Sequence, residues 1–236
     1  MKLIAVGDIH GRKTWEKVLK DNPDFDKFVF VGDYFDAFPP MTADQIFETF
    51  KKILAFKAEH PDKVVLCMGN HDFQYTPMGE GERYSGYNPK TAENLATLGE
   101  WWKDMVAAYQ HKDVLFSHAG LTATWAEKYL PANVPQDQVA EYIDAHMWHG
   151  GSDYFKFFDG DTSYCGENVN QGPFWVRPKA LLSDMYRDLW QVVGHTGTGG
   201  GLVVEGKLIM IDTGAKGQYL KIEDGVITEG DIFFGV

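Results

Sequence analysis

Five short apolar runs, each followed within two residues by aspartate, asparagine or histidine, constrain the fold of this chain more than any other feature. We expect these runs to form strands, and they cover Leu3–Val6, Phe28–Val31, Val64–Met68, Val114–Ser117 and Gln191–Gly194. A helical pattern extends from Thr42 to Glu59, and Thr42 with Gln45 predicts a capping box at its start. Strands that alternate with helices indicate parallel pairing and βαβ units.

The last fifth of the chain has a different pattern. Its short apolar segments are joined by Glu-Gly and Asp-Gly pairs, which are typical of antiparallel hairpins. The segments are Leu202–Val204, Leu208–Ile211, Tyr219–Ile222 and Val226–Ile227. Two further helices are expected, at Thr14–Lys20 and Ala92–Gln110. We therefore predict an α/β protein with two packed sheets and helices outside them, formed as a single domain over residues 1–236.

Charge and cysteine usage narrow the class of protein. The net charge of −12 argues against a broad basic surface for long nucleic acids, although it allows a phosphorylated substrate. Cys67 lies inside an apolar run and is expected to be a buried free thiol, which fits a reducing compartment. The chain has no signal-peptide layout at its start and no run of the ~18 apolar residues that a membrane span needs. We expect a cytoplasmic protein without a membrane partner.

Two segments, 73–91 and 147–175, interrupt the regular pattern. Both are rich in glycine and aromatic residues. Long loops in compact domains are uncommon and often functional. The alternative is that their aromatic side chains only anchor the loops to the core, and the sequence leaves both interpretations open.

The residues that follow the apolar runs have the chemistry of metal ligands. Asp8 and His10 follow the first run, Asp33 and Asp36 the second, Asn70, His71 and Asp72 the third, Ser117 and His118 the fourth, and His195 the fifth. Ligand sites in parallel sheets collect at the carboxyl ends of the strands. Oxygen ligands mixed with imidazoles suit Mn²⁺, Fe or Zn²⁺ better than Ca²⁺. The set is large enough for two ions, which a carboxylate such as Asp33 could bridge at about 3.5–4 Å.

Six short motifs resemble those of the calcineurin-like metallophosphoesterases, particularly the phosphoprotein phosphatase branch. They are "GDIHG" (7–11), "GDYFD" (32–36), "GNHD" (69–72), "SHAG" (117–120), "GH" (194–195) and "IDTGA" (211–215). The resemblance covers essentially the whole chain. It implies a four-layer αββα sandwich of two mixed sheets flanked by helices, with 73–91 and 147–175 as variable loops.

The resemblance also implies roles for the motif residues. One metal ion would be held by Asp8, His10 and Asp33, and the other by Asp33, Asn70, His118 and His195. The two divalent ions, expected to be Mn²⁺ with Fe or Zn²⁺ as alternatives, would activate a bridging hydroxide for in-line attack on phosphorus. His71, oriented by Asp36, would protonate the leaving group, and Asn70 would also contact the substrate.

One motif departs from the family pattern. Family members often carry Asp-Arg-Gly after the second motif, and that arginine grips the phosphate, whereas this chain reads "DAF" at 36–38. The pocket therefore lacks one bidentate phosphate clamp. Arg177 is expected to compensate, with a surface arginine stacked on Trp175 as the alternative interpretation. Arg12 and Arg83 are weaker candidates.

These features predict a two-metal phosphoesterase, similar to serine/threonine phosphatases, that hydrolyses a phosphomonoester. The substrate would be a phosphoprotein or a small phosphorylated molecule. Dinucleoside polyphosphate hydrolase or phosphodiesterase activity on the same core is an alternative, since the aromatic loops could stack a nucleobase. A non-catalytic binding protein would be a different class, and it predicts missing ligands, of which the sequence has none.

Overall fold

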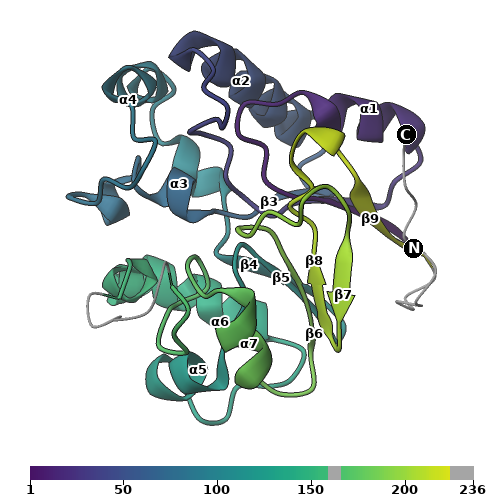
Figure 1. Cartoon of the computed structure of the whole chain (residues 1–236), viewed down its shortest axis with the longest axis vertical. Coiled ribbons are helices and arrows are strands. Elements are labelled where there is room, and N and C mark those ends of the chain that lie inside the picture. Colours follow the sequence, from purple (N-terminus) through teal and green to yellow (C-terminus); the bar gives the residue numbers. More distant parts are fainter. Residues whose placement is uncertain (159–165, 224–236) are drawn as a thin grey trace.

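The computed structural model describes residues 1–158 and 166–223, and two β-sheets form its centre (Figure 1). The first sheet has the strand order β3-β2-β1-β9. Its strands are β1 (Lys2–Val6), β2 (Lys27–Phe30), β3 (Val64–Leu66) and β9 (Tyr219–Glu223). The first three strands are parallel, and β9 runs antiparallel to β1. Three motif-bearing strands therefore end at the same edge of this sheet.

The second sheet has the order β4-β5-β6-β8-β7. Its strands are β4 (Ala108–His111), β5 (Val114–Ser117), β6 (Trp190–Val193), β7 (Val203–Glu205) and β8 (Leu208–Met210). The inner strands β5, β6 and β8 are parallel, whereas β4 and β7 pair antiparallel at the edges. Both sheets are therefore mixed.

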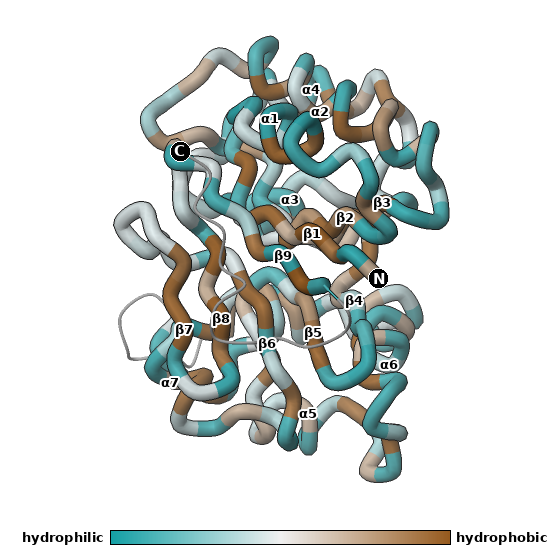
Figure 2. The backbone as a smooth tube through the Cα atoms, turned by 90° about the vertical axis from the view of Figure 1, so that its right-hand side faces the viewer, coloured by the Kyte–Doolittle hydropathy of each residue, from teal (hydrophilic) through white to brown (hydrophobic). Residues whose placement is uncertain are grey.

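Helices cover the outer face of each sheet (Figures 1 and 2). On the first sheet lie α1 (Thr14–Asp21) and α2 (Ala43–Glu59), with α4 (Pro89–Ala96) beside α2. On the second lie α5 (Ala123–Tyr129), α6 (Val139–His146) and α7 (Pro178–Ser183). The short helix α3 (Asn70–Phe73) follows β3. Four layers result, and the predicted αββα sandwich is confirmed.

Alternation along the strands explains this layering, because successive side chains of a strand point to opposite faces. In β1, Leu3 belongs to the core between the sheets, whereas Ile4 belongs to the core beneath α1 and α2. In β6, Val192 faces the other sheet, and Val193 packs in the cluster that includes Leu181 of α7. Each sheet is thus apolar on both faces and requires a layer on either side.

The prediction for Ala92–Gln110 is wrong. Helix α4 ends at Ala96, a 3₁₀ turn covers Trp101–Asp104, and β4 follows. Gly99 adopts a left-handed φ of 68°, which interrupts the helical path. Residues Ala108–His111 instead form β4, which pairs with β5.

Most other elements agree with the sequence. The capping box of Thr42 and Gln45 is present at the start of α2, and Cys67 is a buried free thiol. The β7–β8 hairpin turns at Glu205-Gly206, as expected. However, Tyr219–Glu223 pairs with β1 in the first sheet instead of extending the hairpin. Val226–Ile227 and Cys165 lie outside the described residues.

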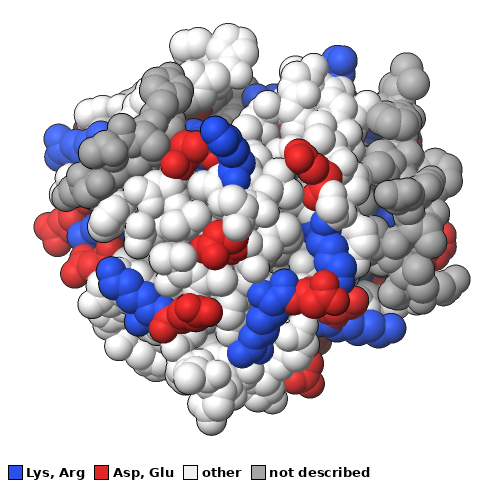
Figure 3. Space-filling model, turned by 60° about the horizontal axis from the view of Figure 1, so that its bottom comes forward, with Lys and Arg blue, Asp and Glu red and all other residues white. Residues whose placement is uncertain are grey.

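The surface carries both signs of charge. On the face that Figure 3 shows, Lys and Arg side chains are interspersed with Asp and Glu, and the described residues there form no continuous basic stripe. This distribution agrees with the net charge of −12. Across the described part of the chain, every helix is too short or too polar to cross a membrane.

Candidate active site

The predicted ligands gather where the strands of both sheets end. Asp8 and His10 follow β1, Asp33 follows β2 and Asn70 begins α3 after β3, while His118 and His195 follow β5 and β6 of the second sheet. The first five of these side chains are buried and His195 is half-buried. Six positions that are far apart in sequence therefore share one site.

The backbone at this site adopts unusual conformations. Of the six non-glycine residues with positive φ in the described chain, four lie here: His10, Asp33, Asp36 and His195. Such conformations persist only where the surroundings fix them, and they cluster at functional sites. Asp72 supplies much of this support, because its carboxylate accepts hydrogen bonds from the backbone amides of Asp33 and Tyr34, both at 2.7 Å.

Two of the polar side chains at the strand ends bind backbone amides. Asp72 is fully buried and also accepts a hydrogen bond from the amide of Gly69, so its oxygens bind backbone groups. Ser117 accepts a hydrogen bond from the amide of Gly120. Both side chains stabilise the loops that carry their neighbours.

The first group of ligand atoms comes from Asp8, His10 and Asp33, whose atoms lie within 4.8 Å of one another. Nε2 of His10 lies 3.8 Å from Oδ2 of Asp8 and 3.7 Å from Oδ2 of Asp33. Nδ1 of His10 donates to the carbonyl of Phe35 at 2.7 Å, which orients Nε2 toward the carboxylates.

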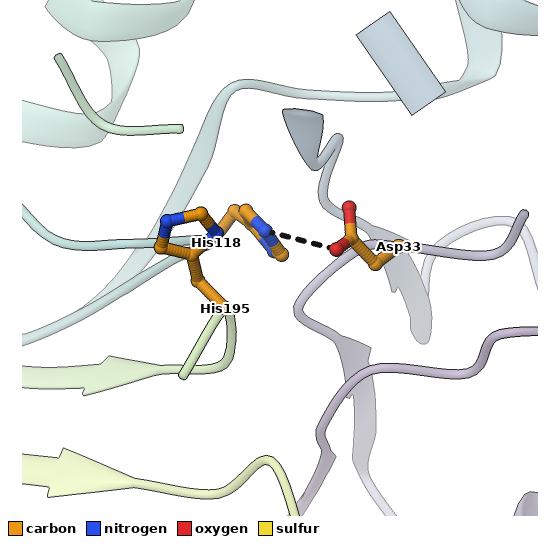
Figure 4. Close-up of side chains that lie close together, drawn as sticks. All are labelled: Asp33, His118 and His195. Carbon is orange, nitrogen blue, oxygen red and sulfur yellow. Dashed lines mark ion pairs between the residues drawn. The ribbon is translucent and has the colours of Figure 1, made fainter. Parts of the chain in front are cut away.

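The second group contains Asp33 again, with His118 and His195 (Figure 4). Oδ2 of Asp33 lies 3.3 Å from Nε2 of His118. Backbone carbonyls fix both rings: His118 Nδ1 lies 3.0 Å from Val31 O, and His195 Nε2 lies 3.1 Å from Trp175 O. With these ring nitrogens donating, the opposite nitrogens of the neutral rings carry lone pairs.

Asn70 completes this second group. Its Oδ1 lies 2.9 Å from His118 Nε2 and 3.1 Å from His195 Nδ1. Three lone pairs therefore face one another with no proton between them in the neutral tautomers. Such an arrangement is unfavourable by itself and suits a cation, so the residues present fit a divalent metal ion.

The electrostatics of the site point the same way. Burial and the nearby carboxylates of Asp212 and Asp33 raise the pKa of Asp8 well above its usual range. Burial lowers the pKa of His10, and burial together with His118 lowers that of His195, which keeps both imidazoles neutral. A neutral imidazole is the form that binds metal, and a bound cation would relieve the repulsion between the crowded carboxylates.

Two motif glycines allow the carboxylates to pack directly on backbone. A Cβ atom on Gly69 would lie 2.2 Å from Oδ1 of Asp33, and a Cβ atom on Gly194 would lie 2.0 Å from Oδ1 of Asp8. Any side chain at either position would displace a predicted ligand. The glycines of "GNHD" and "GH" are thus explained by close approach.

His71 and Asp36 form a hydrogen-bonded pair beside the first group of ligands. Nδ1 of His71 lies 3.0 Å from Oδ2 of Asp36, and the rings of His71 and His10 are 5.4 Å apart. Tyr75 and Gln74 donate hydrogen bonds to the same carboxylate. Burial opposes protonation of His71, but the carboxylates of Asp33 and Asp36 outweigh it and raise the pKa of His71. The pair can hold and deliver a proton.

A cavity of about 630 Å³ opens over these residues. Its walls include aromatic side chains from the predicted variable loops and from the loop after β2, namely Phe38, Tyr84, Phe157 and Trp175. The described parts of both variable loops thus line the site. The cavity has the size and mixed lining typical of small-molecule sites.

The sequence comparison agrees with this geometry. The calcineurin-like phosphoesterase family matches residues 1–199. The chain belongs to this family. No curated protein matches the sequence. Family membership, together with the ligand groups, supports a phosphoesterase hydrolase with candidate metal-binding residues.

Solved structures resemble this calcineurin-like phosphoesterase in fold. A cold-active protein-tyrosine phosphatase from a psychrophilic Shewanella species has a TM-score of 0.62 and 19% identity, covering 95% of this chain and 76% of that one. A yeast (Saccharomyces cerevisiae) protein serine/threonine phosphatase with similarity to human PP5 has a TM-score of 0.53 and 16% identity, covering 89% and 66%. At these identities the likeness concerns the fold.

The three arginines weighed for phosphate binding occupy different places in this phosphoesterase. Arg177 lines the cavity, and its Nη1 donates to the carbonyl of His195 at 2.8 Å. Arg12 donates to the carbonyl of Asp8 at 3.0 Å, on the side of the first ligand group. Arg83 lies over the ring of Tyr87 and lines a separate cavity.

Sequence reasoning missed several residues of the site. Asp212 lines the cavity and raises the pKa of Asp8, although the sequence pattern pointed only to its motif, "IDTGA". Tyr75 and Gln74 lie in the loop 73–91 and bind Asp36. Nothing in their spacing distinguishes them from residues that merely anchor a loop.

Proposed function

We propose that this calcineurin-like phosphoesterase hydrolyses phosphomonoesters with two divalent metal ions, expected to be Mn²⁺. The position of Asp33 carries the proposal. Its Oδ2 lies 3.7 Å from His10 Nε2 and 3.3 Å from His118 Nε2, so one carboxylate belongs to both ligand groups. When bound, two ions supply an acidified water and charge stabilisation for the phosphoryl oxygens.

The donor set divides between the two ions. Asp8, His10 and Asp33 would hold one, and Asp33, Asn70, His118 and His195 would hold the other. The carbonyls of Phe35, Val31 and Trp175 keep the three imidazoles in the required orientation. Such supporting hydrogen bonds typically matter about 10–100-fold for metal affinity.

His71 acts as the proton donor in this proposal. Its Nδ1 is held by Asp36, and the ring lines the cavity, so Nε2 is the atom that delivers the proton. The proton goes to the leaving oxygen as its bond to phosphorus breaks. General acid catalysis of this kind contributes roughly 10²–10⁴-fold.

Arg177 binds the phosphate in this proposal. It lines the cavity and is the basic residue next to the second ligand group. The Shewanella and yeast relatives are named tyrosine and serine/threonine phosphatases, and both names refer to phosphomonoesters. This agreement supports monoester hydrolysis without choosing between the two substrate classes.

Hydrolysis of p-nitrophenyl phosphate and bis-p-nitrophenyl phosphate by metal-stripped protein, before and after Mn²⁺ addition, tests the proposal. We expect Mn²⁺-dependent turnover of the monoester, a much slower reaction of the diester, and loss of turnover in Asp33→Asn with the fold retained. Preferred turnover of the diester would replace the proposal with a phosphodiesterase. Unchanged turnover in Asp33→Asn would refute the site assignment.

A further inference from the structure

Phe38 stands out among the apolar side chains of the described chain. It is 51% exposed, and only Met1 and Tyr154 are also large, apolar and exposed in that part of the molecule. Its position is inside the catalytic cavity, beside the proposed proton donor. An exposed aromatic ring in the wall of a cavity is available to contact a bound ligand.

The ring of Phe38 is held in place although it is exposed. Its centroid lies 6.0 Å from that of His71 and 6.0 Å from that of His10, both in edge-to-face geometry. The backbone of Gly86 packs against it as well, since a Cβ atom there would lie 3.0 Å from Cζ of Phe38. These contacts hold the ring, and its exposed part contributes to the cavity wall.

The direction of the leaving group follows from the position of the proton donor. A proton passes from His71 Nε2 to the leaving oxygen only if that oxygen points toward His71. The organic group attached to this oxygen then extends past His71, where Phe38 lies at 6.0 Å. Phe38 is therefore placed where it can contact the group to which the phosphate is attached.

We propose that Phe38 stacks against the aromatic ring of the leaving group, so that the preferred substrates are aryl phosphates such as a phosphorylated tyrosine side chain. This inference rests on the proposed function. In the reaction, water oxygen bonds to phosphorus, the bond from phosphorus to the phenolic oxygen breaks, and His71 protonates that oxygen. Water and the aryl phosphate give the phenol and inorganic phosphate, and the proton released from water restores His71.

The inhibition constants of two competitive inhibitors test this contact. Inhibitors are used because aryl esters react faster than alkyl esters even without a contact to Phe38. Benzylphosphonate is the non-hydrolysable isostere of phenyl phosphate, and ethylphosphonate lacks the ring. Aromatic pairs contribute enough for an effect of about 2- to 12-fold. We expect Phe38→Ala to raise the inhibition constant of benzylphosphonate by this factor and to change that of ethylphosphonate by less than about twofold. Phe38→Tyr should keep the tighter binding of benzylphosphonate relative to ethylphosphonate, and Phe38→Leu should not.

Tyr154→Ala is the matched control, because Tyr154 is 46% exposed and lies outside the cavity. It should leave both inhibition constants unchanged. Equal effects of Phe38→Ala on the two phosphonates, or no effect on either, would overturn the inference while metal-dependent turnover would still support the proposed function. Absence of any monoester turnover in the wild-type protein would instead refute the proposed function and the inference with it.

A second comparison decides whether the aryl phosphate belongs to a small molecule or to a protein. Free phosphotyrosine and a phosphotyrosine peptide share the aryl phosphate and differ only in the chain around it. Equal kcat/KM values would assign a small aryl phosphate as substrate, and a large advantage for the peptide would assign a phosphoprotein. A higher kcat/KM for a phosphoserine peptide than for the matched phosphotyrosine peptide would contradict the preference for aryl phosphates.

Discussion

His71 and Asp36 face each other through a 3.0 Å contact between Nδ1 and Oδ2, at the edge of the metal-ligand cluster. Tyr75 and Gln74 bind the same carboxylate, so Asp36 is held from three sides. His71, the proposed proton donor, is thereby held by residues that do not belong to the candidate metal-ligand groups. This arrangement separates proton delivery from metal binding, and variants can test the two independently.

Replacing His71 with Gln should affect alkyl phosphates much more than p-nitrophenyl phosphate. An alkoxide needs a proton in order to leave, whereas p-nitrophenolate leaves readily without one. We expect kcat for an alkyl phosphate to fall about 10²–10⁴-fold and kcat for p-nitrophenyl phosphate to fall far less. Asp36→Asn should also lower kcat for the alkyl phosphate more than for p-nitrophenyl phosphate, with smaller losses than in His71→Gln. Equal losses for both esters would show that His71 is not the proton donor.

Gly194→Ala should weaken metal binding while preserving the fold. The new Cβ atom would lie 2.0 Å from Oδ1 of Asp8 and must push that carboxylate aside. We expect Mn²⁺ affinity, measured by calorimetry, to fall about 10–100-fold. Gly197→Ala is the matched control, because its Cβ atom would meet only Oδ2 of Asp212 at 3.5 Å. Equal affinity in both variants would contradict the close packing of Asp8 on Gly194.

Arg177→Met should weaken the binding of phosphate without removing metal. A charged hydrogen bond to phosphate contributes enough to raise the inhibition constant of inorganic phosphate by about 10–100-fold. The Mn²⁺ content of the variant should be that of the wild type. Arg83→Met serves as control, since Arg83 lies over Tyr87 outside this cavity. A similar change in both variants would exclude Arg177 as the phosphate ligand.

His146 should make the protein less stable in mild acid. Burial lowers its pKa from the ordinary value of 6.5, and its Nε2 has no hydrogen-bond partner among the described residues. The unfolded chain therefore takes up a proton below that value before the folded chain does, and the free energy of unfolding falls as pH falls through it. His146→Phe removes the contribution of His146 to this pH dependence.

Urea unfolding of the wild type and His146→Phe at about pH 7.5 and about pH 5.5 measures the effect. The wild type should lose more stability between the two values than the variant. Phe keeps a ring beside Tyr154, whose ring now lies 5.6 Å from that of His146. An identical pH dependence in both proteins would show that His146 titrates normally in the folded state.

Local sequence patterns predicted those parts of the fold that depend on local interactions. Strand β5 has the predicted bounds of Val114–Ser117, and the capping box of Thr42 lies at the start of α2. The order of motifs after strands also indicated which side chains would meet, because parallel strands end at a common edge. The gathering of Asp8, His10 and Asp33 follows from this rule.

The features that the sequence did not predict depend on contacts between distant segments. The partner of Tyr219–Glu223 is β1, which no local pattern could indicate. Asp72 and Asp33 both follow apolar runs, yet one carboxylate binds backbone amides and the other faces two imidazoles. The direction of each carboxylate is set by the neighbouring loop, so spacing alone cannot distinguish a ligand from a structural support.

Electron paramagnetic resonance of the Mn²⁺-loaded protein tests the central claim most directly. If Asp33 bridges two ions, the wild type should give the spectrum of a magnetically coupled Mn²⁺ pair, at two ions per chain. Asp33→Asn should lose the coupling and the turnover of p-nitrophenyl phosphate together. A spectrum of isolated Mn²⁺ from the fully active wild-type protein would contradict the two-metal account.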